Sequence, residues 1–274
     1  MNEIRLPERA NTQCFYSGLD HIDRCRDKQH FLSYSHSVEY VYNSQGFRDT
    51  EWPTTDTDRA VWCLGDSFTV GVGSPQVHTW PHRLSTTGQQ RTVNVSMDGA
   101  SNEWIARRCC DVYRWARPKN IVIMWSYLHR REAQQHINDI DRRVHYIRST
   151  VAEDFKNFEQ CRNDVKNCCA ESNLIEFIIP GWEPGLTQLS WNNVRDPAWP
   201  TLVQNLKTTD TAILTELQQL HGIDIEILAQ QLLSQDQTFN GVIQVPQLDL
   251  ARDGHHFDVV TSDWVVNQIL PRLT

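Results

Sequence analysis

Residues 60 to 67 read Ala60-Val61-Trp62-Cys63-Leu64-Gly65-Asp66-Ser67, and this stretch decides both the fold class and the first candidate site. Five apolar residues in succession, ended by a glycine, are typical of a strand that is buried on both faces of a parallel sheet. The serine follows just beyond the carboxyl end of that strand. Open α/β sheets bind their ligands at this edge, so the stretch predicts a strand that leads into a site.

Four similar apolar runs follow along the chain, and segments with helical spacing lie between them. The further strands are predicted at residues 92–95, 121–125, 174–179 and 241–245. Helices are predicted at 102–116, within about 132–170, and at 211–220, 224–233 and 259–273. This alternation predicts an α/β protein, a three-layer α/β/α sandwich with a central, mostly parallel five-stranded sheet.

The first 58 residues differ from the rest of the chain. They are polar and aromatic and have no long helical period, although Tyr40-Val41-Tyr42 predicts a short strand. A charged, hydroxyl-rich linker at residues 54–59 leads into the regular alternation. We therefore expect residues 1–58 to form an N-terminal extension packed on a main domain of residues 59–274, a length that buries a sizeable core.

Composition excludes several classes of function. The formal net charge of −8 argues against nucleic acid as a partner, since a phosphate-tracking surface needs clustered lysine and arginine. The sequence contains no run of eighteen apolar residues, so it predicts no membrane span. The N-terminus lacks the apolar core of a secretory signal, which is expected of a cytoplasmic chain or of one whose leader has been removed. The oligomeric state is left open.

Eight cysteines are present, including the adjacent pairs Cys109-Cys110 and Cys168-Cys169. Adjacent pairs do not resemble a disulfide framework, and no CxxC…CxxC zinc pattern occurs. Cys161, Cys168 and Cys169 lie close in sequence without a matching fourth ligand. We therefore predict reduced, mostly buried thiols and no metal site.

A second polar motif follows the fifth predicted strand. Asp253-Gly254-His255-His256 puts an acid three residues ahead of a histidine, at the same sheet edge as Ser67. A serine is a weak nucleophile and needs a base within hydrogen-bond reach, and the acid orients that base. The acid-to-base spacing selects His256 over His255.

Taken together, these motifs resemble the SGNH (GDSL-type) serine hydrolases. Gly65-Asp66-Ser67 resembles their first block, residues 94–101 with Gly99 their second, and Asp253-x-x-His256 their last. The resemblance implies a flavodoxin-like fold, Ser67 as nucleophile, His256 as base and Asp253 as its orienting acid. It also implies the backbone amides of Ser67 and Gly99 as oxyanion donors. Residues 43–48, Asn-Ser-Gln-Gly-Phe-Arg, are similar to a segment of one group within this family, which includes proteins of phages and marine microbes.

The third block departs from the family pattern, in which an asparagine after the third strand completes the oxyanion hole. This chain has Trp125-Ser126-Tyr127-Leu128 there, without an asparagine. Another group can substitute, the hole can have two donors, or the activity can be weak or lost. Asn102 is the candidate substitute, and its alternative role is to cap the helix that it begins.

The expected function is an esterase that forms an acyl-enzyme on Ser67, with a small-molecule or glycan ester as substrate, including an O-acetylated carbohydrate or another short-chain ester. Trp182, in the tryptophan-rich stretch 180–200, and Arg130 are candidate substrate-binding residues. Two alternatives stay open: an acyltransferase that uses the same serine, and a catalytically silent SGNH-like binding or structural protein. The esterase chemistry requires no metal or organic cofactor.

Overall fold

The predicted parallel sheet is confirmed in a computed structural model, which describes residues 4–25, 27–128, 130–132, 151–180 and 241–274. The five strands are β3 (Val61–Gly65), β4 (Thr92–Ser96), β5 (Asn120–Trp125), β6 (Asn173–Ile178) and β7 (Ile243–Gln244). They lie in the order β4-β3-β5-β6-β7, and every neighbouring pair is parallel. The chain order reverses beside β3, so the end of β3 lies at the position where open α/β sheets form a ligand crevice.

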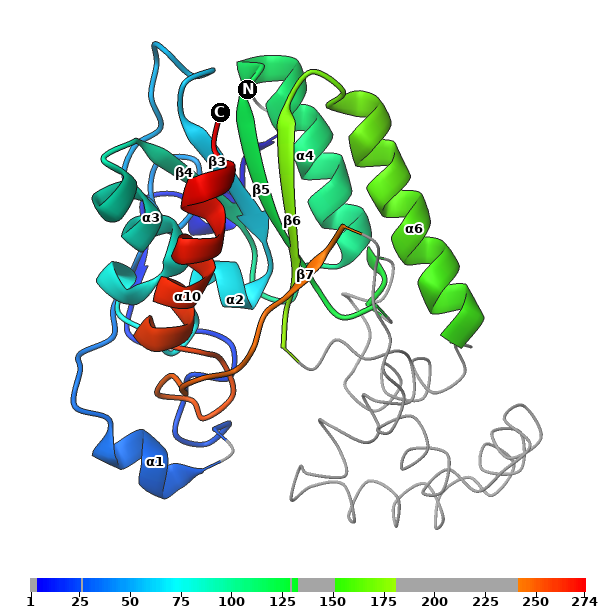
Figure 1. Cartoon of the computed structure of the whole chain (residues 1–274). Helices are drawn as coiled ribbons and strands as arrows, with labels where there is room; N and C mark the ends of the chain where they lie inside the picture. The colour runs from blue at the N-terminus through cyan, green and yellow to red at the C-terminus, as the bar shows by residue number, and fades with distance from the viewer. Residues whose placement is uncertain (1–3, 26, 129, 133–150, 181–240) are drawn as a thin grey trace.

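Helices cover both faces of the sheet (Figure 1). On one face α4 (Asn102–Ala116) packs against α6 (Val151–Cys168), and on the other α3 (Trp80–Gly88) packs against α10 (Val259–Ile269). The short elements η3 (Gln76–His78) and η6 (Leu270–Arg272) adjoin α3 and α10, and α2 (Ser67–Val70) follows β3. The architecture is the predicted three-layer α/β/α sandwich.

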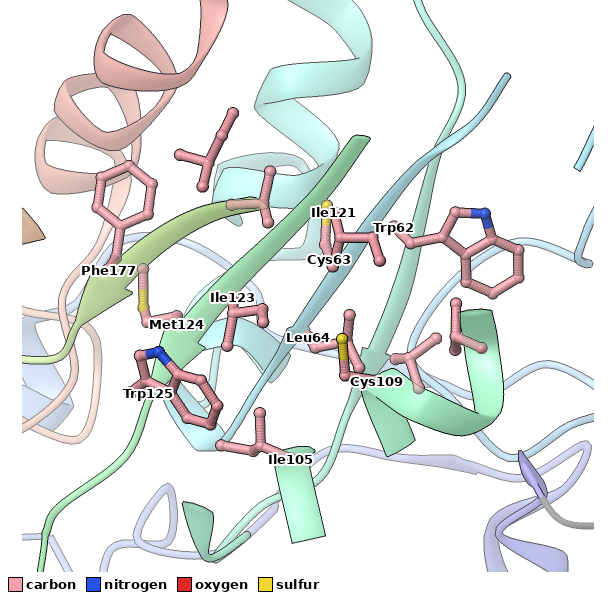
Figure 2. Close-up of a cluster of buried hydrophobic side chains, with 14 of the residues drawn as sticks. Trp62, Cys63, Leu64, Ile105, Cys109, Ile121, Ile123, Met124, Trp125 and Phe177 are labelled. Atoms are coloured by element: carbon pink, nitrogen blue, oxygen red, sulfur yellow. The ribbon is translucent and has the colours of Figure 1, made fainter. Parts of the chain in front are cut away.

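The core lies between these layers. Every residue of β3, β4 and β5 is buried, which explains why their sequences are continuous apolar runs rather than alternating ones. Figure 2 shows side chains of the central strands, among them Leu64, Ile123 and Trp125, beside Ile105 and Cys109 of α4. Within the described residues no helix combines the length and the apolar character needed to cross a membrane.

The residues before β3 contribute to the same core. They contain η2 (Pro7–Arg9), α1 (Lys28–Ser33) and a two-stranded antiparallel sheet of β1 (Gln13–Cys14) and β2 (Tyr40–Val41). Leu6, Phe47 and Trp52 belong to the main core cluster, and the Trp52 ring packs edge-on against Trp62 of β3. The extension at residues 1–58 therefore shares buried apolar contacts with the sheet, and its boundary at residue 58 stays a proposal.

Most predicted elements are present, and the differences have local causes. The predicted strand at Tyr40 and the helices at 102–116 and 259–273 are found, the last one ending in a 3₁₀ turn at Pro271. Helix α3 was not predicted, and β7 has two residues instead of five. The predicted helices at 211–220 and 224–233, the tryptophan-rich stretch 180–200 and the first part of 132–170 lie outside the described residues.

Candidate active site

The turn after β3 holds Ser67 in a fixed position. Asp66 caps α2 by accepting a hydrogen bond from the Phe68 N–H at 3.0 Å, and the helix ends at Gly71, which has a φ of 74°. A left-handed residue at this position favours glycine. Gly65 must also lack a side chain, because an added Cβ would lie 2.1 Å from Thr69 Oγ1. The Gly65-Asp66-Ser67 sequence thus defines a tight strand-to-helix turn with the serine at its first helical position.

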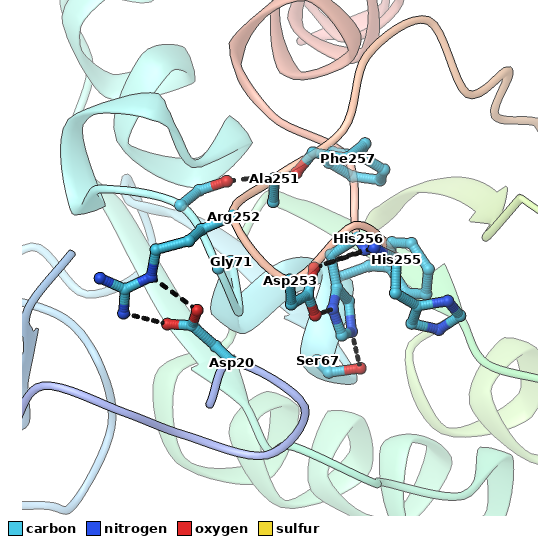
Figure 3. Close-up of polar contacts among 12 residues, drawn as sticks. Asp20, Ser67, Gly71, Ala251, Arg252, Asp253, His255, His256 and Phe257 are labelled. Atoms are coloured by element: carbon cyan, nitrogen blue, oxygen red, sulfur yellow. Dashed lines mark hydrogen bonds and ion pairs between the residues drawn. The ribbon is translucent and has the colours of Figure 1, made fainter. Parts of the chain in front are cut away.

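Ser67, His256 and Asp253 form one continuous chain of hydrogen bonds (Figure 3). Ser67 Oγ lies 2.8 Å from His256 Nε2, and His256 Nδ1 lies 2.5 Å from Asp253 Oδ2. The other carboxylate oxygen, Oδ1, accepts the backbone N–H groups of His255 and His256, each at 3.0 Å. All three side chains are at most 3% exposed. The structure therefore brings Ser67 together with the Asp253–His256 pair that the sequence singled out, 189 positions from Ser67 to His256.

The electrostatics of this group keep the acid ionised and the histidine basic. Burial alone would raise the pKa of Asp253, but the charge of His256 and its hydrogen bond outweigh burial and lower this pKa to about 2. Burial alone would lower the pKa of His256, but the charge of Asp253 and the same hydrogen bond raise it above its ordinary value. An ionised acid behind a basic imidazole is the arrangement that removes a proton from a serine.

Arg48, the last residue of the motif at residues 43–48, stabilises the turn that contains Ser67. Its buried guanidinium donates to the backbone carbonyls of Val70 at 3.1 Å, Gly71 at 2.7 Å and Ser74 at 2.9 Å. Burial lowers the pKa of Arg48, and the ring of Tyr40 lies 4.3 Å from its Cζ. The sequence motif singled out this segment, but the role of Arg48 depends on contacts with residues that are distant in sequence.

An ion pair between the half-buried Arg252 and the buried Asp20 supports the other side of the site. Arg252, next to Asp253, donates from Nε and Nη2 to the carboxylate of Asp20 at 2.7 and 2.6 Å, as Figure 3 shows. The Tyr40 hydroxyl donates to Asp20 at 2.6 Å and accepts from the Gly73 N–H at 2.8 Å. The extension thus connects the Ser67 turn and the Asp253 turn, which sequence reasoning missed because neither Asp20 nor Arg252 belongs to a recognisable motif.

Two backbone donors that follow the ends of β3 and β4 are free of hydrogen bonds to the described residues. Neither the N–H of Ser67 nor that of Gly99 donates a hydrogen bond within the described part of the chain. Gly99 has a φ of 76°, is exposed, and follows the end of β4. Both groups therefore stay available to a ligand, which is what the family resemblance predicts for oxyanion donors.

The structure corrects the expectation for Asn102. Its side-chain N–H groups donate to the carbonyls of Ser126 at 3.2 Å and Tyr127 at 3.3 Å, and its Oδ1 accepts from the Ser126 N–H at 2.8 Å. Both donors of the amide are used, so the side chain has none left for an oxyanion. Nor does it cap α4, because that cap is Ser101, whose Oγ accepts from the Trp104 N–H. Asn102 instead fixes the segment after β5.

We predict that Asn102→Ala lowers stability more than turnover. Asn102 is fully buried, and its loss leaves the Ser126 N–H and two carbonyls without their partner. Each buried unsatisfied group costs about 1–3 kcal/mol, so the thermal midpoint should fall by roughly 5 °C or more. Ser101→Ala, which removes the true cap, should cost about 1 kcal/mol. A normal midpoint with turnover reduced by about 10²–10³-fold would instead make Asn102 an oxyanion donor.

A cavity of about 470 Å³ opens beside Ser67 and His256. Its wall combines Leu19 and Arg24 of the extension with Asp98 and Arg130 of the main domain. Arg130 donates to Asp66 Oδ2 and to Ser126 Oγ, both at 3.0 Å, so it also neutralises the fully buried Asp66. Burial raises the pKa of Asp66, and the charge of Arg130 opposes this. Trp182, the other substrate-binding prediction, lies outside the described residues.

The fold and this site together define a class of protein: an α/β/α sandwich in which a serine after β3 is hydrogen-bonded to a histidine–aspartate pair after β7. No protein-family model and no curated protein matches the chain. Among solved structures it is similar to that of TesA, with 13% identity over 78% of this chain and 98% of that chain, at a TM-score of 0.38. The GDSL-like lipase of Bacteroides thetaiotaomicron shares 14% identity, with coverages of 81% and 91% and a TM-score of 0.39. The lipase/acylhydrolase of Enterococcus faecalis shares 19% identity, with coverages of 78% and 97% and a TM-score of 0.36.

Proposed function

We propose that this protein is a serine-dependent ester hydrolase, with Ser67 as nucleophile, His256 as general base and Asp253 as the acid that orients it. The observation that carries this proposal is the position of the His256 ring. Its Nε2 lies 2.8 Å from Ser67 Oγ while its Nδ1 lies 2.5 Å from a buried carboxylate. Such a ring has one tautomer that accepts the serine proton, because the other nitrogen carries a proton held by the acid.

The reaction follows from these contacts. His256 Nε2 takes the proton of Ser67 as Oγ attacks the ester carbonyl, and the N–H groups of Ser67 and Gly99 stabilise the oxyanion. His256 then gives that proton to the leaving alcohol, which leaves an acyl group on Ser67. A water molecule, deprotonated by the same imidazole, releases the acid and restores the serine. An oxyanion hole with two backbone donors is sufficient for these reaction steps. The loss of one donor lowers turnover by about 10²–10³-fold and does not abolish it.

For the substrate we propose a small ester, of the size of a short-chain or O-acetylated carbohydrate ester. A cavity of about 470 Å³ is at the lower part of the range for small-molecule sites. Arg130 and Arg24 in its wall supply donors for hydroxyl or anionic groups of the alcohol part. Arg130 is therefore proposed as a substrate-binding residue, and Trp182 stays a proposal from the sequence.

A fluorophosphonate probe tests the proposed function directly. It reacts with a serine only if a neighbouring base activates that serine, so the intact chain should be labelled once, on the peptide that contains Ser67. Hydrolysis of p-nitrophenyl acetate should be lost in proportion to labelling. An unlabelled chain that also fails to cleave short-chain esters would favour the silent binding protein over the enzyme.

The pH dependence of the reaction provides a second prediction. The rate should rise as His256 loses its proton, since only the neutral imidazole accepts the proton of Ser67. Because its pKa is raised, the half-maximal point of kcat/KM should lie above the ordinary histidine value of about 6.5. The measurement is the pH profile of p-nitrophenyl acetate cleavage, corrected for spontaneous hydrolysis. A profile that is flat through this range, or that falls with increasing pH, would contradict the assignment of His256 as base.

A further inference from the structure

Four cysteines gather where α4 packs against the end of α6, on the face of the sheet opposite α3 and α10 (Figure 1). Cys109 and Cys110 lie on α4, and Cys168 and Cys169 lie at the end of α6. All eight cysteines of the chain are unpaired. This thiol cluster takes no part in the triad, the cavity or the contacts that support them, so the proposed ester hydrolysis does not account for it.

The sulfur atoms of Cys110, Cys168 and Cys169 lie within 4.8 Å of one another. Adjacent residues of a helix point in different directions, but α6 ends at Cys168 and Cys169 begins a turn, which lets both sulfurs face Cys110. Zinc–sulfur bonds of about 2.3 Å at tetrahedral angles separate the sulfurs by about 3.8 Å. Small side-chain rotations would therefore bring the three thiols to the spacing of a metal site.

We propose that Cys110, Cys168 and Cys169 bind a thiophilic metal ion of the Zn²⁺ type. Thiolate ligands select Zn²⁺ and other soft ions over Mg²⁺ or Ca²⁺. Three protein ligands leave one coordination position for water, as in exchangeable rather than closed zinc sites. Cys168 is partly exposed and provides the route of entry, while Cys169 is fully buried.

Neighbouring groups fit a bound ion. The Cys109 sulfur lies 3.8 Å from that of Cys169, so its S–H can donate to Cys169 once that residue is a thiolate. Three thiolates and one Zn²⁺ carry a net charge of −1. The positive charge of Arg114, which also pairs with Asp111 at 3.0 Å, acts on both Cys110 and Cys168 and offsets part of this charge.

Binding should release protons. A cysteine thiol has an ordinary pKa of about 8.5 and is mostly protonated at neutral pH, whereas a metal binds the thiolate. One Zn²⁺ therefore displaces one proton from each of the three ligands. The affinity should consequently increase with pH.

Metal binding explains the cluster better than a disulfide does. A disulfide joins only two sulfurs, whereas the sulfurs of Cys110, Cys168 and Cys169 all lie close to one another, as the ligands of one ion do. It would also require an oxidant, which metal binding does not. The sequence-based expectation of no metal considered Cys161, Cys168 and Cys169 and rested on the lack of a matching fourth ligand. In the structure Cys110, on a different helix, takes the place of Cys161 beside Cys168 and Cys169.

The test uses the full chain, reduced and then freed of reductant under argon. Dialysis against Zn²⁺ followed by elemental analysis should find one ion per chain, and Cd²⁺ should give a thiolate-to-metal charge-transfer band. Cys168→Ser should weaken binding at least about tenfold, because a ligand is lost. The matched control is Cys14→Ser, because Cys14 is a partly exposed cysteine on β1 outside the cluster. This variant should bind Zn²⁺ as the wild type does.

A second measurement does not depend on a substitution that could disturb the fold. Zn²⁺ should protect Cys168, the partly exposed member of the three, from alkylation, as mapped by mass spectrometry, and leave the partly exposed Cys14 and Cys25 equally reactive. Two results would overturn the proposal: no saturable binding of Zn²⁺ or Cd²⁺, or binding that is unchanged in Cys168→Ser. Ser67→Ala should bind the ion normally, so failure of this site and failure of the proposed hydrolase are separate outcomes.

Discussion

Replacing Ser67 with alanine should reduce kcat/KM for a short-chain ester by about 10³- to 10⁶-fold. Ser67 Oγ is the atom that lies 2.8 Å from His256 Nε2, and alanine has no atom there to receive an acyl group. Because the three residues act as a unit, removal of the nucleophile alone should abolish almost all the rate that the triad provides. The remaining activity should reflect only binding and the backbone donors.

The fold should not change in this variant. Ser67 is buried, but its side chain contributes to the turn only through His256, while Asp66 and Gly71 define the turn itself. We expect a thermal midpoint within a few degrees of the wild type. Ser85→Ala, on α3 and outside the cavity wall, is the control and should retain full activity. Undiminished hydrolysis by Ser67→Ala would reject Ser67 as the nucleophile.

The sequence predicted the sheet from its buried strands, whereas the roles of Ser67, His256 and Asp253 came from the resemblance to the SGNH hydrolases. Strands that are buried on both faces must be apolar throughout, so β3, β4 and β5 were visible as continuous runs. Parallel strands bring their carboxyl ends to one edge, so Ser67 and the segment 253–256 could be placed at the same edge of the sheet. Because β5 and β6 lie between β3 and β7, the direct contact of His256 with Ser67 is known only from the structure.

The features that the sequence did not predict depend on contacts between distant segments. Helix α3 begins with Trp80-Pro81 and contains two threonines, a composition without a clear apolar stripe, and it is stabilised by packing on α10. The N-cap of α4 is Ser101 and not the neighbouring Asn102, because the amide of Asn102 is hydrogen-bonded to the segment after β5. The support that Arg48 and Asp20 give to the two triad turns is likewise a property of the tertiary structure.

Changing Asp253 to asparagine should lower kcat by about 10⁴-fold while leaving the fold intact. Asparagine keeps an oxygen that accepts the backbone N–H groups now bonded to Oδ1, but it presents an NH₂ group where Oδ2 faces His256. His256 Nδ1 would then accept a hydrogen bond, so the ring proton would move to Nε2. An imidazole with its proton on Nε2 cannot remove the proton of Ser67, and this tautomer accounts for the lost rate.

The same variant should change the acid sensitivity of the fold. Because the pKa of Asp253 is lowered from 3.8 to about 2, the ionised carboxylate stabilises the folded state at every pH above its unfolded value. That contribution, about 2 kcal/mol, is lost as the pH falls from about 4 towards 2. Asp253→Asn should lack this contribution at neutral pH and should lose less stability in that window, as measured by denaturant unfolding.

The control is Asp258→Asn, which removes another carboxylate that is bonded to a histidine, His78. His78 is not the histidine that contacts Ser67, so this variant should retain turnover within a few-fold. If Asp253→Asn kept wild-type kcat, Asp253 would not orient the base, and the triad would reduce to Ser67 and His256.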